Sequence, residues 1–310
     1  MLSSTISIFV SGSNTDYVPL QIGFVENSFT GAAYRSHGFY DFYHKYQDEL
    51  RDGKNITNDL SYLKVKIPKY SPQYQPSLLE DLPTHIKQLF PSANVSVITD
   101  LDVHNGAIFN HNHLIPKNAY DILVLGHQEY VTQEEYSNLK TYVLNGGTLI
   151  IPTGNVFYAE VKYDPVMHDL TLVKGHDVTF NGKVAHKGIS ERWKNETKQW
   201  LGSNFYPIYT WQKEYHKLYN NPFNFTGLGG GEEQYYDKNN HDIRIILDYK
   251  SSDERYPIAT YELKYGEGKV IVIGLAAEDI LDPCIDSCHK FYDFIDHLFL
   301  NYALDSTTYK

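Results

Sequence analysis

The stretch that decides the fold runs from Tyr120 to Asn155 and reads YDILVLGHQEYVTQEEYSNLKTYVLNGGTLIIPTGN. It contains two short apolar runs, residues 122–125 and 148–151, with an amphipathic segment between them. Apolar runs of this length are typical of strands that are buried on both faces of a sheet. The stretch therefore predicts a strand, a helix, and a second strand that lies parallel to the first.

The predicted helix has its own start and stop signals. Thr132, followed three residues later by Glu135, forms the pattern of a capping box. The apolar positions then recur with the spacing of one buried helix face, at Tyr136, Leu139, Tyr142 and Val143. Gly146 and Gly147 end the pattern, as glycines commonly do at helix C-termini.

Polar residues follow each of the two predicted strands. The sequence GHQEY at 126–130 follows the first strand, and TGN at 153–155 follows the second. In open α/β sheets, ligands bind outside the carboxyl ends of the strands. We therefore expect His127, Glu129 and Asn155 to converge at one edge of a functional site.

The rest of the chain gives a coarser picture. Residues 27–42 combine small residues with glycines after a predicted strand at 21–25, which indicates a tight loop at another edge of the site. An insertion of short strands and turns is expected at about 156–242, and an amphipathic helix is expected at 289–302. Because no internal repeat is visible, the sequence predicts a single α/β domain over residues 1–310.

The composition argues against several classes of function. The chain of 310 residues carries a net charge of −11, which disfavours binding to a nucleic-acid backbone. No apolar run approaches about 18 residues, so no membrane-spanning helix is expected. Residues 1–13 lack the basic start and long apolar core of a secretion signal, so the expected location is the cytoplasm. The sequence leaves open whether the chain forms a homo-oligomer.

The cysteines and tyrosines carry different information. Cys284 and Cys288 are too few to make a zinc site by themselves. They also come late in the chain with no strand-to-helix elbow before them, which argues against a glutaminase-type thiol hydrolase. The chain has 27 tyrosines. Most are expected at the edge of the core, but phenol oxygens are also ligands for a hard metal ion.

Four motifs together resemble the C-terminal catalytic domain of the N,N-dimethylformamidase large subunit. They are TGAAY at 30–34, Lys69-Tyr70, GHQEY at 126–130, and Gly147 with the later Gly154-Asn155. The resemblance covers most of the chain and is clearest from about Val25 to Tyr158. It implies a class I glutamine-amidotransferase-like (flavodoxin-like) fold, in which helices flank a mostly parallel sheet. The family's lectin-like region and small subunit have no recognisable counterpart in this sequence.

The resemblance also implies a metal centre, because the family holds a mononuclear iron with two tyrosines and one glutamate. Carried over residue by residue, the glutamate falls on Glu129, and the first tyrosine falls on Tyr34 within a Thr-x-x-Ala-Tyr pattern. The second tyrosine falls on Tyr70, where the family's Arg-Pro-Tyr reads Pro-Lys-Tyr, and Tyr74 is a rival for this role. Such an all-oxygen, anionic set suits Fe(III).

The reaction implied by the resemblance is hydrolysis of a small amide, such as a formamide, by metal-activated water. The family's histidine falls on His127, which can move a proton near neutral pH. Its asparagine falls on Asn155, which can donate to the developing oxyanion. Glu278 is a candidate for a further acid, although the sequence around it does not align with the family.

Each of these residues also has an ordinary structural explanation. Glu129 can stabilise a helix N-terminus, His127 and Asn155 can be turn residues, and the tyrosines can be edge-of-core aromatics. The alternative function is therefore a non-catalytic, amidotransferase-like domain that binds a carbohydrate or a partner chain. This alternative predicts that Tyr34 and Tyr70 lie far from Glu129.

Overall fold

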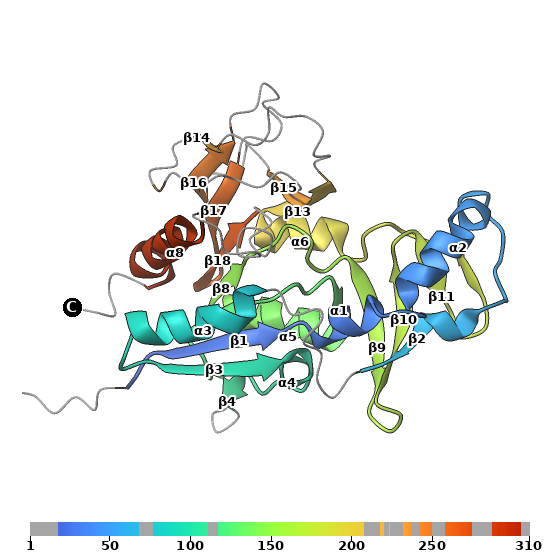
Figure 1. Cartoon of the computed structure of the whole chain (residues 1–310), viewed down its shortest axis with the longest axis horizontal. Helices are drawn as coiled ribbons and strands as arrows, with labels where there is room; N and C mark the ends of the chain where they lie inside the picture. Colours follow the sequence, from blue (N-terminus) through green and yellow to red (C-terminus); the bar gives the residue numbers. More distant parts are fainter. Residues whose placement is uncertain are drawn as a thin grey trace, which may run out of the picture.

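The computed structural model describes residues 18–67, 77–110, 117–207, 218–219, 223, 232–236, 242–249, 258–274 and 287–304. These residues form a mixed α/β architecture with two main sheets (Figure 1). The larger sheet has eight strands in the spatial order β14 (Leu218–Tyr219), β16 (Ile243–Tyr249), β17 (Ile258–Tyr265), β18 (Gly268–Ile273), β8 (Thr148–Ile151), β6 (Ile122–Leu125), β1 (Gln21–Glu26) and β3 (Asn94–Thr99).

The predicted parallel strands lie in the larger sheet. β3, β1, β6, β8 and β18 run parallel, and β17, β16 and β14 extend the sheet with antiparallel pairings. Ile122 of β6 lies opposite Thr148 of β8. Helix α5 (Gln133–Leu144) lies between these two strands in the chain, so the predicted βαβ unit is confirmed.

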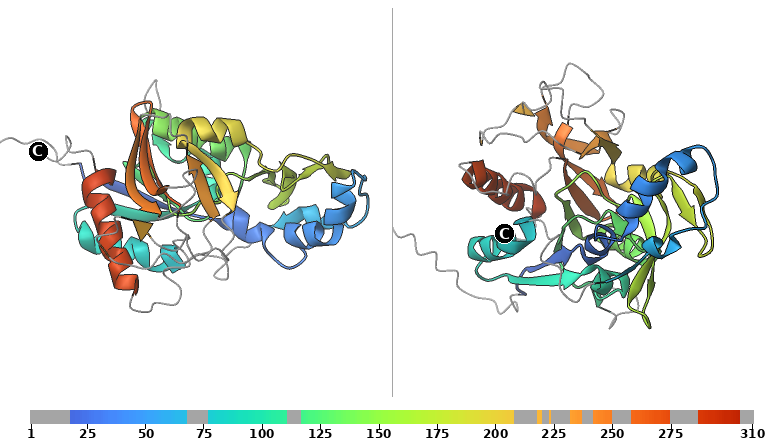
Figure 2. Two further views of the ribbon diagram at one scale, coloured as in Figure 1. Left: turned by 90° about the horizontal axis from the view of Figure 1, so that it is seen from above. Right: turned by 45° about the vertical axis from the view of Figure 1, so that its right-hand side comes forward.

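Helices cover both faces of the larger sheet (Figure 2). On one face lie α3 (Ser77–Leu89) and α8 (Ser287–Leu298), which continues as a π-helix (Phe299–Ala303); on the other face lie α4 (Asp100–His104), α5 and α6 (Lys194–Leu201). β6 is buried on both sides, since Val124 packs in the first core and Leu123 in the second. This is the burial that its continuous apolar run predicts.

The smaller sheet has six strands and belongs to a lobe at the right of Figure 1. Its order is β12 (Ala185–Lys187), β11 (Val178–Phe180), β10 (Asp169–Gly175), β9 (Ala159–Asp164) and β7 (Tyr130–Val131), and β2 (Lys64–Lys66) also pairs with β10. The strands expected at the start of the region 156–242 are thus present. They share a third core with α1 (Ser28–Ala33), α2 (Phe39–Arg51) and the 3-10 helix η1 (Leu60–Leu63).

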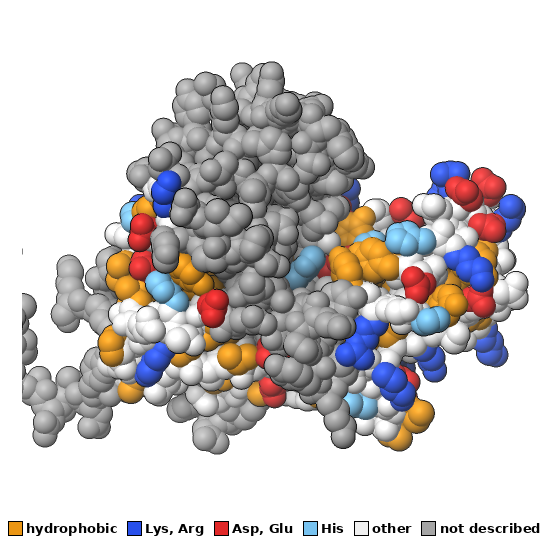
Figure 3. Space-filling model, viewed as in Figure 1, with side chains coloured by type: hydrophobic (Ala, Val, Ile, Leu, Met, Phe, Trp, Pro, Cys, Tyr) orange, Lys and Arg blue, Asp and Glu red, His pale blue; other side chains and the backbone are white. Residues whose placement is uncertain are grey.

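Two further small sheets lie outside these layers. One pairs β13 (Ser203–Pro207) with β15 (Glu232–Tyr236), and the other pairs β4 (Phe109–Asn110) with β5 (Lys117–Asn118). Over the described ranges, no helix has the length and apolar character that crossing a membrane requires. On the face seen in Figure 3, acidic and basic side chains are interspersed over the lobe. How the chain divides into domains stays a prediction.

The prediction of a tight loop over residues 27–42 is wrong, because α1 and the start of α2 occupy this region. The N-terminus of α1 is stabilised by a residue that is distant in the sequence, since the Phe29 N–H donates to Asp100 Oδ2 at 2.6 Å. Gly38 allows the chain to turn between the two helices. A Cβ atom at Gly38 would lie 2.6 Å from the carbonyl oxygen of Ala33, so a larger residue would clash with the backbone.

Candidate active site around Glu129

Glu129 lies at the junction of the two main sheets. The chain leaves β6, turns through residues 126–129, and enters β7, which pairs in parallel with β9. The carbonyl groups of Gln128 and Glu129 accept hydrogen bonds from the N–H groups of Phe157 and Tyr158, at 2.8 and 2.9 Å. The turns after β6 and β8 therefore lie side by side. The Glu129 side chain is completely buried.

Four side chains contact the Glu129 carboxylate, two at each oxygen. At Oε2, the Tyr34 hydroxyl donates a short hydrogen bond, and His127 Nε2 lies 3.6 Å away. At Oε1, the Tyr40 hydroxyl donates at 2.8 Å, and His176 Nε2 makes a short contact. The two phenol oxygens lie 3.0 Å apart. The site is therefore a compact cluster of oxygen and imidazole groups around one buried acid.

The two tyrosines come from consecutive helices of the lobe. Tyr34 is the C-terminal cap of α1, and Tyr40 lies in the first turn of α2. Their ring centroids are 4.3 Å apart, with an angle of 37° between the ring planes. The turn between α1 and α2 thus brings both hydroxyls to the same carboxylate.

His176 reaches Glu129 from a hairpin turn with unusual residues. β10 and β11 are joined by only two residues, His176 and Asp177, with φ values of 50° and 60°. Such turns favour Asn-Gly or Asp-Gly, and a left-handed conformation costs other residues on the order of 1 kcal/mol each. The His176 ring also stacks on Tyr130 and Tyr43, with centroids 5.3 and 5.0 Å away. Backbone strain of this kind is often found at functional sites.

A buried pair of acids, Asp100 and Glu135, adjoins the turn that carries Glu129. Asp100 accepts a hydrogen bond from Gln128 Nε2 at 3.1 Å as well as the one from Phe29, so it ties α1 to the turn that carries Glu129. Burial raises the pKa of Asp100 to about 6. Burial, followed by the charge of Asp100, raises the pKa of Glu135 well above its ordinary value. Burial of the pair therefore favours the protonated form of Glu135.

The same physical effects set the protonation of the site itself. Burial opposes ionisation of Glu129, but the nearby charges of His176 and His127 and the hydrogen bonds from His176 and Tyr34 outweigh it, so its pKa is lowered. Burial and then the charge of Glu129 raise the pKa values of Tyr34 and Tyr40. Both phenols are therefore protonated at neutral pH and act as donors to an ionised carboxylate.

Three buried polar atoms in the turns after β6 and β8 have no hydrogen-bond partner within the described ranges: His127 Nε2, Gln128 Oε1 and Asn155 Oδ1. An unsatisfied buried polar group costs about 1–3 kcal/mol, so each one needs an explanation. A small polar ligand beside Glu129 would supply the missing partners.

The structure can be compared with the predicted site residue by residue. Tyr34 and His127 lie against Glu129, and Asn155 lies in the adjoining turn, where it is 4% exposed. Outside the described residues lie Tyr70, its rival Tyr74, Glu278 and Cys284. Cys288 is in the first turn of α8.

Two partners of Glu129 were not predicted from the sequence. Tyr40 is one of many tyrosines, and it stands out only once α2 is known to begin at Phe39. His176 carries a weaker signal, a His-Asp pair between two short strands. Neither residue has a motif that links it to Glu129, because the link is made by the packing of the lobe.

The side chains around Glu129 fit a hard metal ion. A carboxylate and two phenols meet within hydrogen-bonding distance of one another, and oxygen ligands with negative charge suit Fe(III). Among the described residues, no group of three or more His, Cys, Asp or Glu side chains could hold a metal ion. A metal ion at Glu129 would therefore depend on tyrosine oxygens.

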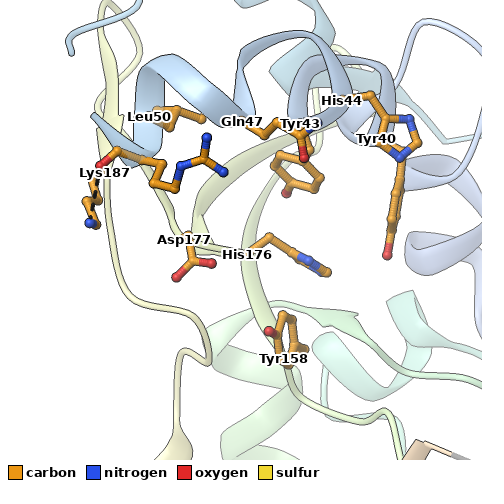
Figure 4. Close-up of a pocket in the computed structure, with 10 residues that line it drawn as sticks. Tyr40, Tyr43, His44, Gln47, Leu50, Tyr158, His176, Asp177 and Lys187 are labelled. Carbon is orange, nitrogen blue, oxygen red and sulfur yellow. Dashed lines mark hydrogen bonds between the residues drawn. The ribbon is translucent and has the colours of Figure 1, made fainter. Parts of the chain in front are cut away.

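A pocket of about 470 Å³ adjoins this cluster on the lobe side (Figure 4). Tyr40 and His176 belong both to its wall and to the partners of the buried carboxylate. Tyr43 and Tyr158 extend the aromatic wall, and Lys187 lies at the end away from Tyr40. The pocket and the buried Glu129 carboxylate therefore share two side chains.

Comparison with known proteins identifies a family. The sequence profile described as N,N-dimethylformamidase beta subunit-like, C-terminal, matches residues 4–249. No curated protein matches the sequence.

Comparison with solved structures finds distant likenesses. A β-galactosidase from G. stearothermophilus is 14% identical to this chain, with a TM-score of 0.48. The match covers 91% of this chain but only 30% of the β-galactosidase. A ThuA-like protein from Bacteroides uniformis is 12% identical with a TM-score of 0.39, covering 92% of this chain and 93% of its own. Neither likeness is close enough to assign a fold, so the amidotransferase-like class is not confirmed.

Proposed function

The chain belongs to the N,N-dimethylformamidase beta subunit-like C-terminal family, and from this premise we propose that it is an iron-dependent amidohydrolase that acts at Glu129. The substrate would be an amide, and water would be the nucleophile. The observation that carries this proposal is the meeting of Tyr34, Tyr40 and His127 at one buried carboxylate. The non-catalytic alternative expects both Tyr34 and Tyr70 far from Glu129; the contact of Tyr34 with Glu129 counts against it, and Tyr70 lies outside the described residues.

The metal ligands follow from the donor set and from the family. Glu129 and Tyr34 would hold the ion, and Tyr70, or Tyr74 in its place, would supply the second phenolate. A bound ferric ion would supply the Lewis acidity that polarises the amide carbonyl and acidifies water. Tyr40 and His176 would then act as neighbours that orient the Glu129 carboxylate through Oε1.

His127 and Asn155 would act on the substrate directly. His127 Nε2 is buried and lies beside Glu129, so it would take a proton from the attacking water and return it to the leaving amine. The unpaired Oδ1 of Asn155 would accept an N–H group, while its amide nitrogen would donate to the carbonyl oxygen. Loss of one such donor typically costs about 3–4 kcal/mol of transition-state stabilisation.

We extend the proposal to the fold class and the assembly. The parallel strands β3, β1, β6, β8 and β18, with helices on both faces, are compatible with a class I glutamine-amidotransferase-like domain. Because the family is described as subunit-like, we also propose that the chain works in an oligomer. Light scattering of the purified protein gives its mass in solution and tests this point.

The proposed function is tested on protein purified without chelators. We expect bound iron by elemental analysis, a visible absorption band from tyrosinate-to-iron charge transfer, and release of amine from formamides. Glu129→Gln should lose all three, because it removes the buried anionic ligand. Glu134→Gln is the matched control, because the Glu134 side chain is 64% exposed. A colourless protein that gains no band when iron is added would contradict the proposal.

A further inference from the structure

The pocket beside Glu129 is large for a dialkylformamide. Its volume of about 470 Å³ falls within the roughly 300–1,000 Å³ that is usual for ligand pockets. A cavity of about 150 Å³ is enough to hold benzene. The pocket can therefore accept a six-membered ring with several further atoms.

One part of the pocket wall is aromatic, and the polar atoms of its rings are engaged elsewhere; His44, Gln47 and Arg51 line other parts of the wall. The Tyr158 hydroxyl is bonded to Ser190 Oγ at 2.7 Å, and the Tyr40 hydroxyl donates to Glu129. His176 Nε2 also contacts Glu129. The rings thus offer the pocket mainly carbon surface. Aromatic groups pair with such rings in edge-to-face or offset geometries and gain more than their buried area alone provides.

The position of the pocket connects it to the proposed reaction. Tyr40 and His176 each have one end on the Glu129 carboxylate and line the pocket as well. The pocket and the proposed amide site therefore share two side chains, Tyr40 and His176.

The outer end of the pocket is polar and open to water. Lys187 and Asp177 are exposed there, on the side away from Tyr40 (Figure 4). Lys187 Nζ makes only a long hydrogen bond of 3.4 Å, to the carbonyl oxygen of Arg51, in the described part of the chain. The pocket therefore suits a group with an apolar ring inside and a polar end toward water.

We propose that this pocket receives an aromatic substituent of the amide, so that the substrate of this chain is an aryl-bearing amide rather than a dialkylformamide. The inference rests on the proposed function, because it takes the amide group to be bound at Glu129. A sugar is the competing occupant, because Gln47, Asp177 and Lys187 also line the pocket and could bond its hydroxyls.

The test measures binding by calorimetry for N-benzylformamide, dimethylformamide, benzyl alcohol and methyl glucoside. We expect N-benzylformamide to bind at least tenfold more tightly than dimethylformamide, because ring burial contributes most of the difference. Gln47→Trp should abolish this preference, because Gln47 is an exposed residue of α2 that lines the pocket. Lys187→Trp should do the same from the opposite side. Glu49→Trp is the matched control on α2, since Glu49 does not line the pocket.

The outcomes separate this inference from the proposed function. Equal binding of the two formamides, no effect of either tryptophan at the pocket, or preferential binding of methyl glucoside would overturn the inference. If dimethylformamide is hydrolysed without any preference for the ring, only the inference fails. If benzyl alcohol binds and Gln47→Trp blocks it, but no amide is hydrolysed, the pocket is an aromatic site and the proposed function fails.

Discussion

His176 and Glu129 are in direct contact through Nε2 and Oε1, although they lie 47 positions apart in the sequence. The contact joins the β10–β11 hairpin of the lobe to the turn that follows β6 of the central sheet. His176 is held in the two-residue turn between β10 and β11, and Glu129 is held in the short turn between β6 and β7. The orientation of the carboxylate therefore depends on the packing of the lobe.

The first prediction concerns this contact. His176→Asn keeps a residue that tolerates positive φ, but its side chain is too short to reach Glu129. We expect iron to bind about 10–100-fold more weakly, as is usual when a residue that orients a metal ligand is removed. Competition with a chelator measures the change.

The control for His176→Asn is His168→Asn. His168 also has a positive φ, 56°, and its Nδ1 is hydrogen-bonded to the Tyr163 hydroxyl at 2.7 Å, away from Glu129. Iron affinity should be unchanged in this variant. Equal affinities in wild type and His176→Asn would show that the His176 contact has no part in metal binding.

The second prediction assigns the phenolate ligands. Tyr34→Phe should remove most of the visible absorption, because it deletes the phenol that meets Glu129 Oε2. Tyr43→Phe makes the same chemical change in a pocket ring, where the nearest hydroxyl partner is Tyr130 at 3.5 Å, and should keep the band. Tyr70→Phe should weaken it. If Tyr40→Phe bleaches the band and Tyr70→Phe does not, the second ligand lies on α2.

The third prediction follows from the raised pKa values of Tyr34 and Tyr40, which keep both phenols protonated at neutral pH. A phenol must lose its proton to bind a metal ion, so iron uptake should release roughly one proton for each phenol that becomes a ligand. Titration with iron in weakly buffered solution, followed with a pH indicator, measures this. Iron uptake without proton release would mean that no phenol is a ligand.

The fourth prediction concerns the buried pair of Asp100 and Glu135. Folding raises the pKa of Asp100 from 3.8 to about 6, so its contribution to stability is full below about pH 4 and is lost as the pH rises through 6. Glu135→Gln removes the neighbouring acid. The gain in unfolding free energy of this variant over wild type should be larger at pH 8 than at pH 5, by on the order of 1–2 kcal/mol.

Urea unfolding at pH 5 and pH 8 checks the fourth prediction. Glu134→Gln, at the exposed neighbouring position, provides the control and should show no such pH-dependent gain. If the difference in unfolding free energy between Glu135→Gln and wild type is the same at both pH values, folding does not change the pKa of Glu135.

The central βαβ unit could be predicted because its signals are local. The apolar runs of β6 and β8 and the spacing of the apolar residues on α5 are visible in a short window of sequence. The Thr132 cap is also confirmed, with Oγ1 accepting from the Glu135 N–H at 3.1 Å. The full capping box is wrong, because the two carboxylate oxygens of Glu135 have no hydrogen-bond partner among the described residues. That the turns after β6 and β8 lie side by side then followed from the parallel arrangement of the strands.

The rest of the site could not be predicted in this way, because it depends on distant partners. α1 has only six residues, and its N-terminus is held by Asp100, 71 positions away. Without that contact in view, residues 27–42 read as a loop. His176 was missed for the same reason, because a left-handed His-Asp turn has no characteristic sequence and only tertiary packing places its ring on Glu129.

The pocket wall and the acid beside it are built by different layers of the molecule. Glu129 belongs to the turn at the end of the central sheet, whereas Tyr40 and His176 belong to a helix and a hairpin that pack within the lobe. Changes in α2 or in the β10–β11 hairpin can therefore remodel the wall without disturbing the eight-stranded sheet. We expect divergence among relatives to concentrate in these two elements, so that new substrate preferences arise while the chemistry at the acid is inherited unchanged.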